Sequence, residues 1–157
     1  MCDALTGQSL RVFGTTLGFF AWPTGCAVHR GILFVADGEG NNLVALHPMT
    51  GARVGQVEFN SPYCLSVDRE SNILYVLDRA DGVVAGISLR PENFATGIGV
   101  FGERGEGPGG FTNAVYVHAD GVHGTIYVTD LAQRCLHVYH EHQGISILVR
   151  IGLRSLM

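Results

Sequence analysis

The sequence lacks several features that would assign it quickly to a class. No apolar run approaches the ~20 residues that a membrane helix needs. There is no phosphate-binding loop, no Gly-x-Ser-x-Gly elbow and no HExxH pair. Basic residues are not in excess, since 14 acids outnumber 10 bases, which argues against a protein that depends on phosphate contacts. Residues 1–10 also lack the apolar core of a signal peptide, so we expect a soluble, cytoplasmic chain without a membrane partner.

Cysteine is sparse, with Cys2, Cys26, Cys64 and Cys135, and no CxxC pair occurs. Four cysteines would allow two disulfides, but their spacing matches no zinc pattern. The last three lie in strand-like runs, where a free cysteine behaves as a small apolar residue. We therefore expect buried thiols.

Glycine is abundant, at 22 of 157 residues, and stands between short runs of Val, Ile, Leu and Tyr. The one stretch that invites a helical interpretation, 125–139, alternates with a period of two. Short apolar runs separated by glycine are typical of many short strands joined by tight turns. The length fits one domain and the 46% hydrophobic content can fill a core, so the sequence predicts an all-β domain.

Three stretches of the chain are similar to one another. Each opens with a short strand, in PTGCAV (23–28), PYCLSV (62–67) and TNAVYV (112–117). After a polar hairpin comes a second strand that ends in Asp, in ILFVAD (32–37), ILYVLD (73–78) and TIYVTD (125–130). Third strands follow at 43–46, 83–87 and 135–139. The Asp recurs after 41 and then 52 residues, the spacing of four-stranded propeller blades.

A fourth strand closes the later repeats, in VFG (100–102) and VRIG (149–152), and a further VFG lies at 12–14. The second repeat leads into a Gly-rich crossover, GERGEGPGGF (102–111), where glycine permits turns with positive φ. We predict a single partial propeller domain over 1–157. Its parts are an outer strand and crossover at 10–22, a first blade at 23–59, a second blade with its Gly-rich crossover at 60–111, and a third blade at 112–152.

These features resemble the NHL-repeat family of β-propellers, over about 10–152. The resemblance rests on a Gly-rich crossover that ends in Phe111, a first strand led by Pro23 or Pro62, and a second strand that ends in Val-x-Asp. It implies an all-β propeller with three four-stranded antiparallel blades plus one N-terminal strand. The family includes RNA-binding regulators, ubiquitin-ligase substrate modules, bacterial sensor domains and a zinc-dependent amidating lyase, so the resemblance implies a fold before a function.

Three blades cannot close a ring, since closed propellers have four to eight and NHL rings typically six. We therefore expect an open or partial ring. The N-terminal side of the first blade and the C-terminal side of the third should then expose apolar faces and favour self-association. A piece of a longer protein, a truncated product and one half of a two-chain ring all remain open.

Alternate loops of a blade emerge on one side, so the crossovers share a face with the turns between second and third strands. That face combines aromatic, arginine and amide side chains, and aromatic and arginine residues are the usual anchors of interfaces. We predict a protein or peptide partner, with RNA as the alternative, although neighbouring acids dilute the positive field. The predicted binding residues are Trp22, Thr24, Asn41, Asn42, Tyr63, Arg79, Arg104, Asn113 and Arg134.

The acids that end the second strands, Asp37, Asp78 and Asp130, are predicted to cap their own turns, because a strand-ending Asp commonly accepts backbone hydrogen bonds there. Histidines gather on the opposite face, with His140 and His142 two residues apart. The loops that carry the histidines lie about two strand spacings apart, near 10 Å, so we expect no metal or other cofactor.

An enzyme is the less favoured interpretation. In the amidating lyase of this family, zinc is held by histidines that follow the proline of the first strand, and the matching positions here are Thr24, Tyr63 and Asn113. None can replace imidazole. A lactonase-like hydrolase would need inward-facing acids, whereas the first-strand runs CAV, CLSV and AVYV are apolar. We predict a binding scaffold without catalytic residues, with a propeller hydrolase or lyase-like enzyme as the alternative.

Overall fold

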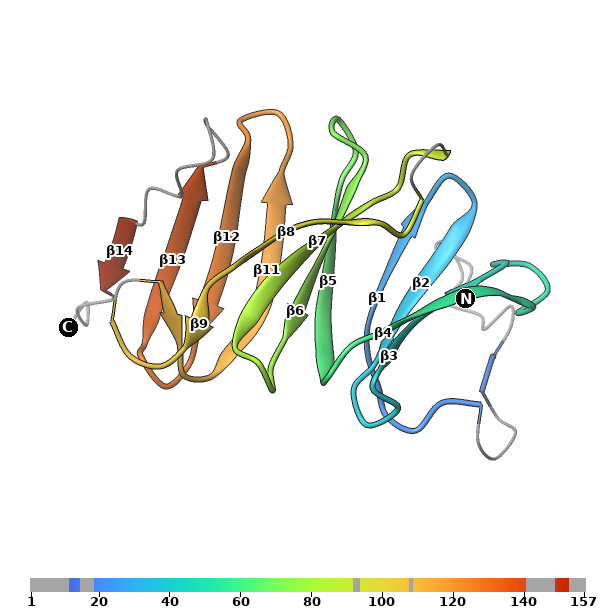
Figure 1. Cartoon of the computed structure of the whole chain (residues 1–157), viewed down its shortest axis with the longest axis horizontal. Coiled ribbons are helices and arrows are strands. Elements are labelled where there is room, and N and C mark those ends of the chain that lie inside the picture. The colour runs from blue at the N-terminus through green and yellow to red at the C-terminus, as the bar shows by residue number, and fades with distance from the viewer. Residues whose placement is uncertain (1–11, 15–18, 92–93, 108, 141–148, 153–157) are drawn as a thin grey trace, which may run out of the picture.

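Three four-stranded antiparallel sheets stand side by side in the computed structural model (Figure 1). Residues 12–14, 19–91, 94–107, 109–140 and 149–152 are described, the last range in its backbone only. Within each sheet every strand pairs with the next in sequence, which is the meander of a propeller blade. The described part of the chain holds no helix of the length and apolarity that a membrane crossing requires.

The same succession of four strands recurs in each blade. Blade 1 contains β1 (Pro23–His29), β2 (Ile32–Asp37), β3 (Asn42–Leu46) and β4 (Arg53–Glu58). Blade 2 contains β5 (Pro62–Asp68), β6 (Ile73–Asp78), β7 (Val83–Ser88) and β8 (Gly97–Phe101). Blade 3 contains β11 (Ala114–Asp120), β12 (Thr125–Asp130), β13 (Cys135–His140) and β14 (Val149–Gly152). The all-β class and the four-stranded antiparallel sheets predicted from the sequence are confirmed.

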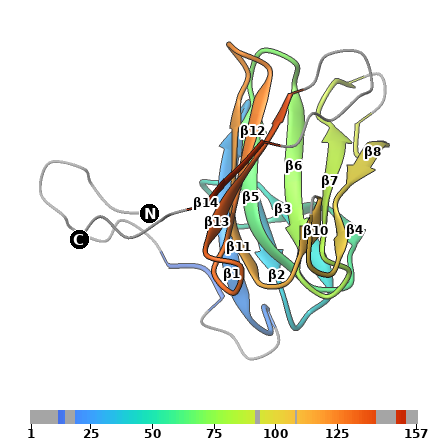
Figure 2. The same cartoon turned by 90° about the vertical axis from the view of Figure 1, so that its left-hand side faces the viewer.

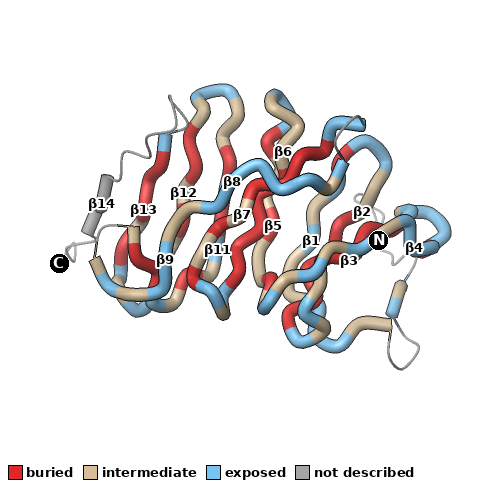
Figure 3. Tube along the Cα trace, viewed as in Figure 1, coloured by how far each residue is buried: buried red, intermediate tan, exposed pale blue. Residues whose placement is uncertain are grey.

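The middle strands carry the core because both faces of each sheet are covered. In β6 every residue after Ile73 is buried, which is why this strand is a continuous apolar run rather than an alternating one. The outer strands are different. In Figure 3 β8 is largely exposed, and β4 alternates between exposed and half-buried residues. The second and third strands of the blades therefore form the packed interior.

Blade 2 packs between its two neighbours. Its first strand, β5, contacts β1 on one side and β11 on the other, so the first strands of the three blades are adjacent. In the turned view of Figure 2, the sheets lie one behind another. One apolar core, with Phe34, Leu43 and Leu74, joins blades 1 and 2, and a second, with Tyr75, Val128 and Tyr139, joins blades 2 and 3.

The Gly-rich crossover joins the second core. Its two short strands, β9 (Glu103–Arg104) and β10 (Gly110–Phe111), pair in parallel. The Phe111 side chain is only 2% exposed, and its ring meets the His137 ring edge to face at 5.1 Å. The Phe111 ring therefore anchors the crossover between blades 2 and 3, because burying a large aromatic side chain stabilises the packed arrangement.

The N-terminal segment differs from the predicted strand. Val12–Gly14 lie in no strand, and Leu10 and Arg11 fall outside the described residues. Blade 1 already has four strands, so these residues have no vacancy in its sheet. Instead Phe19 and Phe20 pack against Val35, Val44 and Leu46, the face of blade 1 that was expected to be open. The phenylalanine side chains cover part of that face, while Cys26 and Val28 on the same face remain exposed.

Within the described part of the chain, no further segment packs on the C-terminal side of blade 3. The third residues of β2 and β6, Phe34 and Tyr75, point toward the next blade, and the third residue of β12 is Tyr127. Tyr127 pairs with His118 in the sheet and stacks on its ring at 6.4 Å. On the same face, Tyr116 is 54% exposed. Self-association through this face remains a prediction.

The cysteine prediction is wrong for Cys26, which is exposed, whereas Cys64 is half-buried and Cys135 is buried. Cys26 pairs with Val35 and so faces the N-terminal side of blade 1. The equivalent residue of blade 2 is Leu65, which is buried because blade 1 covers it. Among the three described blades, none lies on that side of Cys26, and its thiol is exposed.

Candidate binding face

The loops of the three blades emerge at two opposite edges of the sheets (Figure 1). The crossover face, at the lower edge in this view, is formed by segments 19–22, 59–61 and 102–113 with the turns 38–41, 79–82 and 131–134. The hairpin face, at the opposite edge, is formed by the hairpins that join the first strand to the second in each blade and, in blades 1 and 2, by the described residues between the third strand and the fourth.

The same hydrogen-bonded clamp builds the crossover face in each blade. Asp78 accepts the backbone N–H groups of Asn60 (2.8 Å) and Ser61 (3.0 Å). The next residue, Arg79, donates its own N–H back to the Ser61 carbonyl at 3.0 Å. We call this arrangement the aspartate clamp. Asp37 with Trp22 and Asp130 with Asn113 repeat it, including the return bonds from Gly38 and Leu131.

The clamp reaches further than the predicted turn cap. Asp78 and Asp130 do accept bonds from their own turns, from Ala80 and Gln133, but their carboxylates also hold the crossover that enters the blade. Both side chains are 2% exposed. Burial opposes ionisation of Asp130, yet the N–H groups of Gln133, Asn113 and Thr112 outweigh it and hold the pKa of this carboxyl below its ordinary value. The clamp carboxylates thus position backbone.

Three predicted binding residues meet where the clamps of blades 2 and 3 adjoin. The Arg79 guanidinium lies over the Tyr63 ring, 4.4 Å from its centroid. Its Nη2 donates to the Asn113 Oδ1 at 2.7 Å. Tyr63 is at the start of β5 and Asn113 enters β11, so the arginine of blade 2 bridges two inner strands. This stacking and hydrogen bonding hold the exposed Arg79 side chain in one orientation.

Arg79 lines a pocket on the crossover face, and a second arginine, Arg104, lines it too. Arg104 Nη1 donates to the Ala80 carbonyl at 2.8 Å, which places its guanidinium beside the turn that carries Arg79. Gly82 has a φ of +67°, and a Cβ at this position would lie 2.8 Å from the Arg104 Cα. Only glycine accommodates both the left-handed backbone and the close approach of the crossover. The pocket has a volume of about 270 Å³, and besides the two arginines it is lined by Ser61, Asp78, Ala80, Gly82, Phe111, Thr112, Asn113 and Ala114.

Neither arginine of this pocket has an internal counterion. Within the described residues the one ion pair joins His123 to Asp120, on the hairpin face. The acid among the lining residues, Asp78, is buried and accepts hydrogen bonds from backbone donors. Two guanidinium groups with free N–H donors therefore face one pocket, an arrangement that favours a carboxylate or another anion.

The other predicted residues lie apart from this pocket. Trp22 is 60% exposed at the entry to blade 1, and Arg134 is exposed in the last turn. Thr24, half-buried, donates its hydroxyl to the Pro62 carbonyl at 3.1 Å and so joins blades 1 and 2. Asn42 Nδ2 donates to the Gly40 carbonyl at 2.6 Å. The side-chain amide of Asn41, oriented with its nitrogen toward the backbone, donates to the carbonyls of Gly38 and Asn60. These three polar side chains are engaged within the protein.

Sequence reasoning missed Leu131, which is 62% exposed on the crossover face. It follows Asp130 as Arg79 follows Asp78, so the residue after the clamp aspartate faces outward in both blades. The position after the repeated Asp was the available signal. Leu131 adds an apolar group to the crossover face near Asn113, to whose carbonyl it donates its N–H at 3.0 Å.

On the hairpin face, His123 Nδ1 lies 2.7 Å from Asp120 Oδ2 and His140 Nδ1 lies 3.0 Å from Thr125 Oγ1. The hydrogen bond from His123 lowers the pKa of Asp120. His142 falls outside the described residues. Among the residues that the structure does describe, no three His, Cys, Asp or Glu side chains gather closely enough to hold a metal ion.

Comparison with known proteins shows the fold. No protein-family model matches the chain, and no curated protein matches it in sequence. Solved structures of β-propellers do match. The chain is similar to the Cps50 (Swd1) β-propeller domain of Myceliophteria thermophila, with a TM-score of 0.66 and 10% identity over 85% of this chain and 44% of that one.

Two further structures extend the comparison. The RRP9 WD40 repeats give a TM-score of 0.65 and 12% identity over 83% of this chain and 38% of that one. Hydrazine synthase of Kuenenia stuttgartiensis gives 0.62 and 15% over 86% of this chain and 38% of that one. The chain thus spans less than half the length of each of these three proteins. It has the fold of a β-propeller whose ring is not closed.

Proposed function

We propose that the chain is a binding scaffold whose crossover face recognises a protein or peptide partner, with Arg79 and Arg104 contacting a carboxylate of that partner. The observation that carries the proposal is the pocket in which both guanidinium groups lie without an internal counterion. An Asp or Glu side chain, or a chain terminus, offers two oxygens that match a planar guanidinium. Tyr63 and Asn113 hold one of the two arginines in place.

The surroundings of the pocket support a macromolecular partner. Trp22 and Leu131 are exposed on the same face, toward blades 1 and 3 respectively. Aromatic and apolar groups around an arginine pair form the mixed surface that protein interfaces use. The β-propellers that this chain resembles include WD40 repeats, and a nidogen–laminin complex is among the similar structures, with a TM-score of 0.62.

The finer classification is also a proposal. The Gly-rich crossover that ends in the buried Phe111, together with the clamp aspartates, supports repeats of the NHL type. A non-catalytic role is supported by Thr24, Tyr63 and Asn113, which stand where the amidating lyase has zinc ligands. In this chain Thr24 joins two blades while Tyr63 and Asn113 hold Arg79.

The test is a peptide array probed with the full chain and with two charge-matched double variants. Arg79→Gln/Arg104→Gln removes the two pocket guanidiniums. Arg69→Gln/Arg90→Gln removes the same charge from exposed positions on the hairpin face. We expect the unsubstituted chain and the second variant to bind a shared set of peptides enriched in Asp and Glu, and the first variant to bind them at least about tenfold more weakly.

Loss of binding in both variants would indicate a general charge effect and would overturn the assignment to the pocket. Binding that survives in both would overturn it as well. A parallel arm with single-stranded RNA of mixed sequence separates the alternative. RNA binding that is stronger than peptide binding and falls steeply with added salt would contradict a peptide-binding function.

A further inference from the structure

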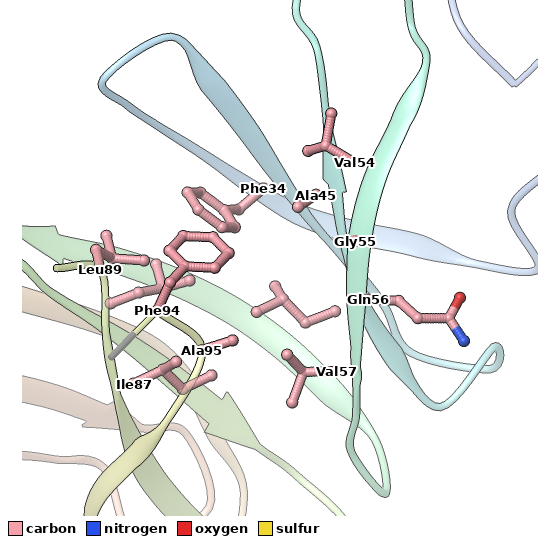
Figure 4. Close-up of a pocket in the computed structure, with 12 residues that line it drawn as sticks. Phe34, Ala45, Val54, Gly55, Gln56, Val57, Ile87, Leu89, Phe94 and Ala95 are labelled. Carbon is pink, nitrogen blue, oxygen red and sulfur yellow. The ribbon is translucent and has the colours of Figure 1, made fainter. Parts of the chain in front are cut away.

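A cavity of about 200 Å³ lies at the outer rim between blades 1 and 2, away from the crossover face. Figure 4 shows Phe34, Ala45, Gly55 and Val57 of blade 1 on one side, and Ile87 with Phe94 on the other. Its lining is mainly apolar, with a smaller polar share. The Gln56 amide points away from it (Figure 4). The cavity is therefore apolar and opens to solvent beside Phe94, which is 42% exposed.

The cavity arises from small side chains in one row of the sheet. Phe34 pairs with Ala45 and Ala45 with Gly55, so all three lie on the face that packs against blade 2. Beyond the Phe34 ring, the row continues with the methyl group of Ala45 and then with Gly55, which has no side chain. The outer part of the interface between the blades thus lacks the atoms that would fill it.

The next interface has a similar row but fills it differently. There Tyr75 pairs with Gly86 and Gly86 with Gly99. The positions held by Val57 and Ile87 at the first interface are taken by Phe101 and Tyr139, whose ring centroids lie 4.6 Å apart. Two aromatic rings occupy the space that two aliphatic side chains leave open between blades 1 and 2.

Gly55 has no conformational reason to be glycine. Its φ is outside the left-handed region, and a Cβ at this position would meet nothing within 4 Å. A larger residue would be tolerated by the backbone and would gain apolar contacts. The effect of glycine at this position is to leave open a cavity that a side chain would close.

We propose that this cavity is a binding site for a small uncharged apolar molecule about the size of one aromatic ring. Apolar pockets of about 150 Å³ remain dry and bind benzene, so the space between blades 1 and 2 suits a ligand of this class. Phe94 and Phe34, with centroids 6.3 Å apart, offer ring faces and edges at the mouth. The lining supplies few polar partners, so a charged ligand is excluded by its desolvation cost.

The test uses the full chain and toluene as the probe, followed by NMR of side-chain methyl groups. We expect saturable shifts of the Val57, Ile87 and Leu89 methyls, with the Val117 and Val128 methyls of the next interface unchanged. Gly55→Leu fills the cavity and should weaken binding at least about tenfold. Gly99→Leu is the matched control, a second outer-strand glycine with open space at its Cβ, and should leave binding unchanged.

A second variant keeps the test informative if Gly55→Leu does not fold. Val57→Phe places at this interface the phenylalanine that the next interface has at the same position, Phe101, and it should likewise weaken binding at least about tenfold. Shifts that do not saturate up to the solubility of toluene would overturn the proposal. Equal loss in Gly99→Leu, or unchanged binding in folded Gly55→Leu and Val57→Phe, would overturn it too.

Discussion

Removing one clamp carboxylate should cost a large part of the stability of the domain. Asp78 receives the N–H groups of Asn60 and Ser61 from the crossover and those of Ala80 and Asp81 from its own turn. Its side chain is 2% exposed. Asp78→Ala would leave these four donors without their acceptor at the point where blade 2 is joined to the crossover from blade 1.

The expected magnitude follows from the kind of bond lost. A hydrogen bond to a charged group contributes about 1.5–3 kcal/mol, and a buried donor left without its acceptor costs about 1–3 kcal/mol. Because water can replace the carboxylate for some of the four donors, we expect Asp78→Ala to lower the free energy of unfolding by about 3–5 kcal/mol rather than by the full sum. Asp78→Asn retains one acceptor oxygen and should lose about half as much.

The assay is urea unfolding followed by far-UV circular dichroism at pH 7. Asp81→Ala is the control, since Asp81 is exposed and its side chain accepts one bond, from the Asn60 side chain at 2.8 Å. It should change the free energy of unfolding by less than about 0.5 kcal/mol. A loss below about 1 kcal/mol in Asp78→Ala would refute the view that the clamp holds blade and crossover together.

Three further predictions concern acid stability, thiols and the partly covered face of blade 1. Because the folded pKa of Asp130 is lowered, the stability that its carboxylate contributes is present above the unfolded pKa of about 3.9 and is lost as the pH falls through the folded value. The urea midpoints of the unsubstituted chain and of Asp130→Asn should therefore converge between pH 5 and 2. A constant difference between the two midpoints would contradict this. Mass spectrometry after brief thiol alkylation at pH 8 should find Cys26 modified before Cys64 and Cys135, because Cys135 is buried and burial raises the pKa of Cys64. Faster modification of Cys64 than of Cys26 would contradict this order. Phe19→Ala/Phe20→Ala should uncover Val35, Val44 and Leu46 and increase self-association, measured as the average molecular mass by light scattering. An unchanged average mass would show that this face does not drive self-association.

The blades were predictable because local signals agree with one another. The runs that end in Asp37, Asp78 and Asp130 combine β-branched and apolar residues with a turn residue, and the period of the repeat places them in successive sheets. The crossover glycines and Phe111 likewise follow from the need to pass from an outer strand to an inner one.

The ends of the arc and the binding pocket were harder to predict because they depend on distant contacts. Nothing near Cys26 reveals that none of the three described blades covers its side of β1, and the role of Phe19 and Phe20 depends on Val44, which lies in another strand. Tyr63, Arg79 and Asn113 were singled out for their chemistry, but their grouping around one guanidinium arises only when two blades pack. Periodicity gives strands and faces, whereas contacts between blades require the fold.

The central claim is that a partner binds the crossover face of blades 2 and 3. It is tested most directly by hydrogen-exchange mass spectrometry on the full chain, alone and saturated with an acidic peptide selected on the array. We expect added protection at 60–64, 78–82 and 103–114, with 69–72 and 121–124 on the hairpin face unchanged. Protection confined to the hairpin face, or no change at 78–82 and 103–114 in a saturated sample, would contradict the claim.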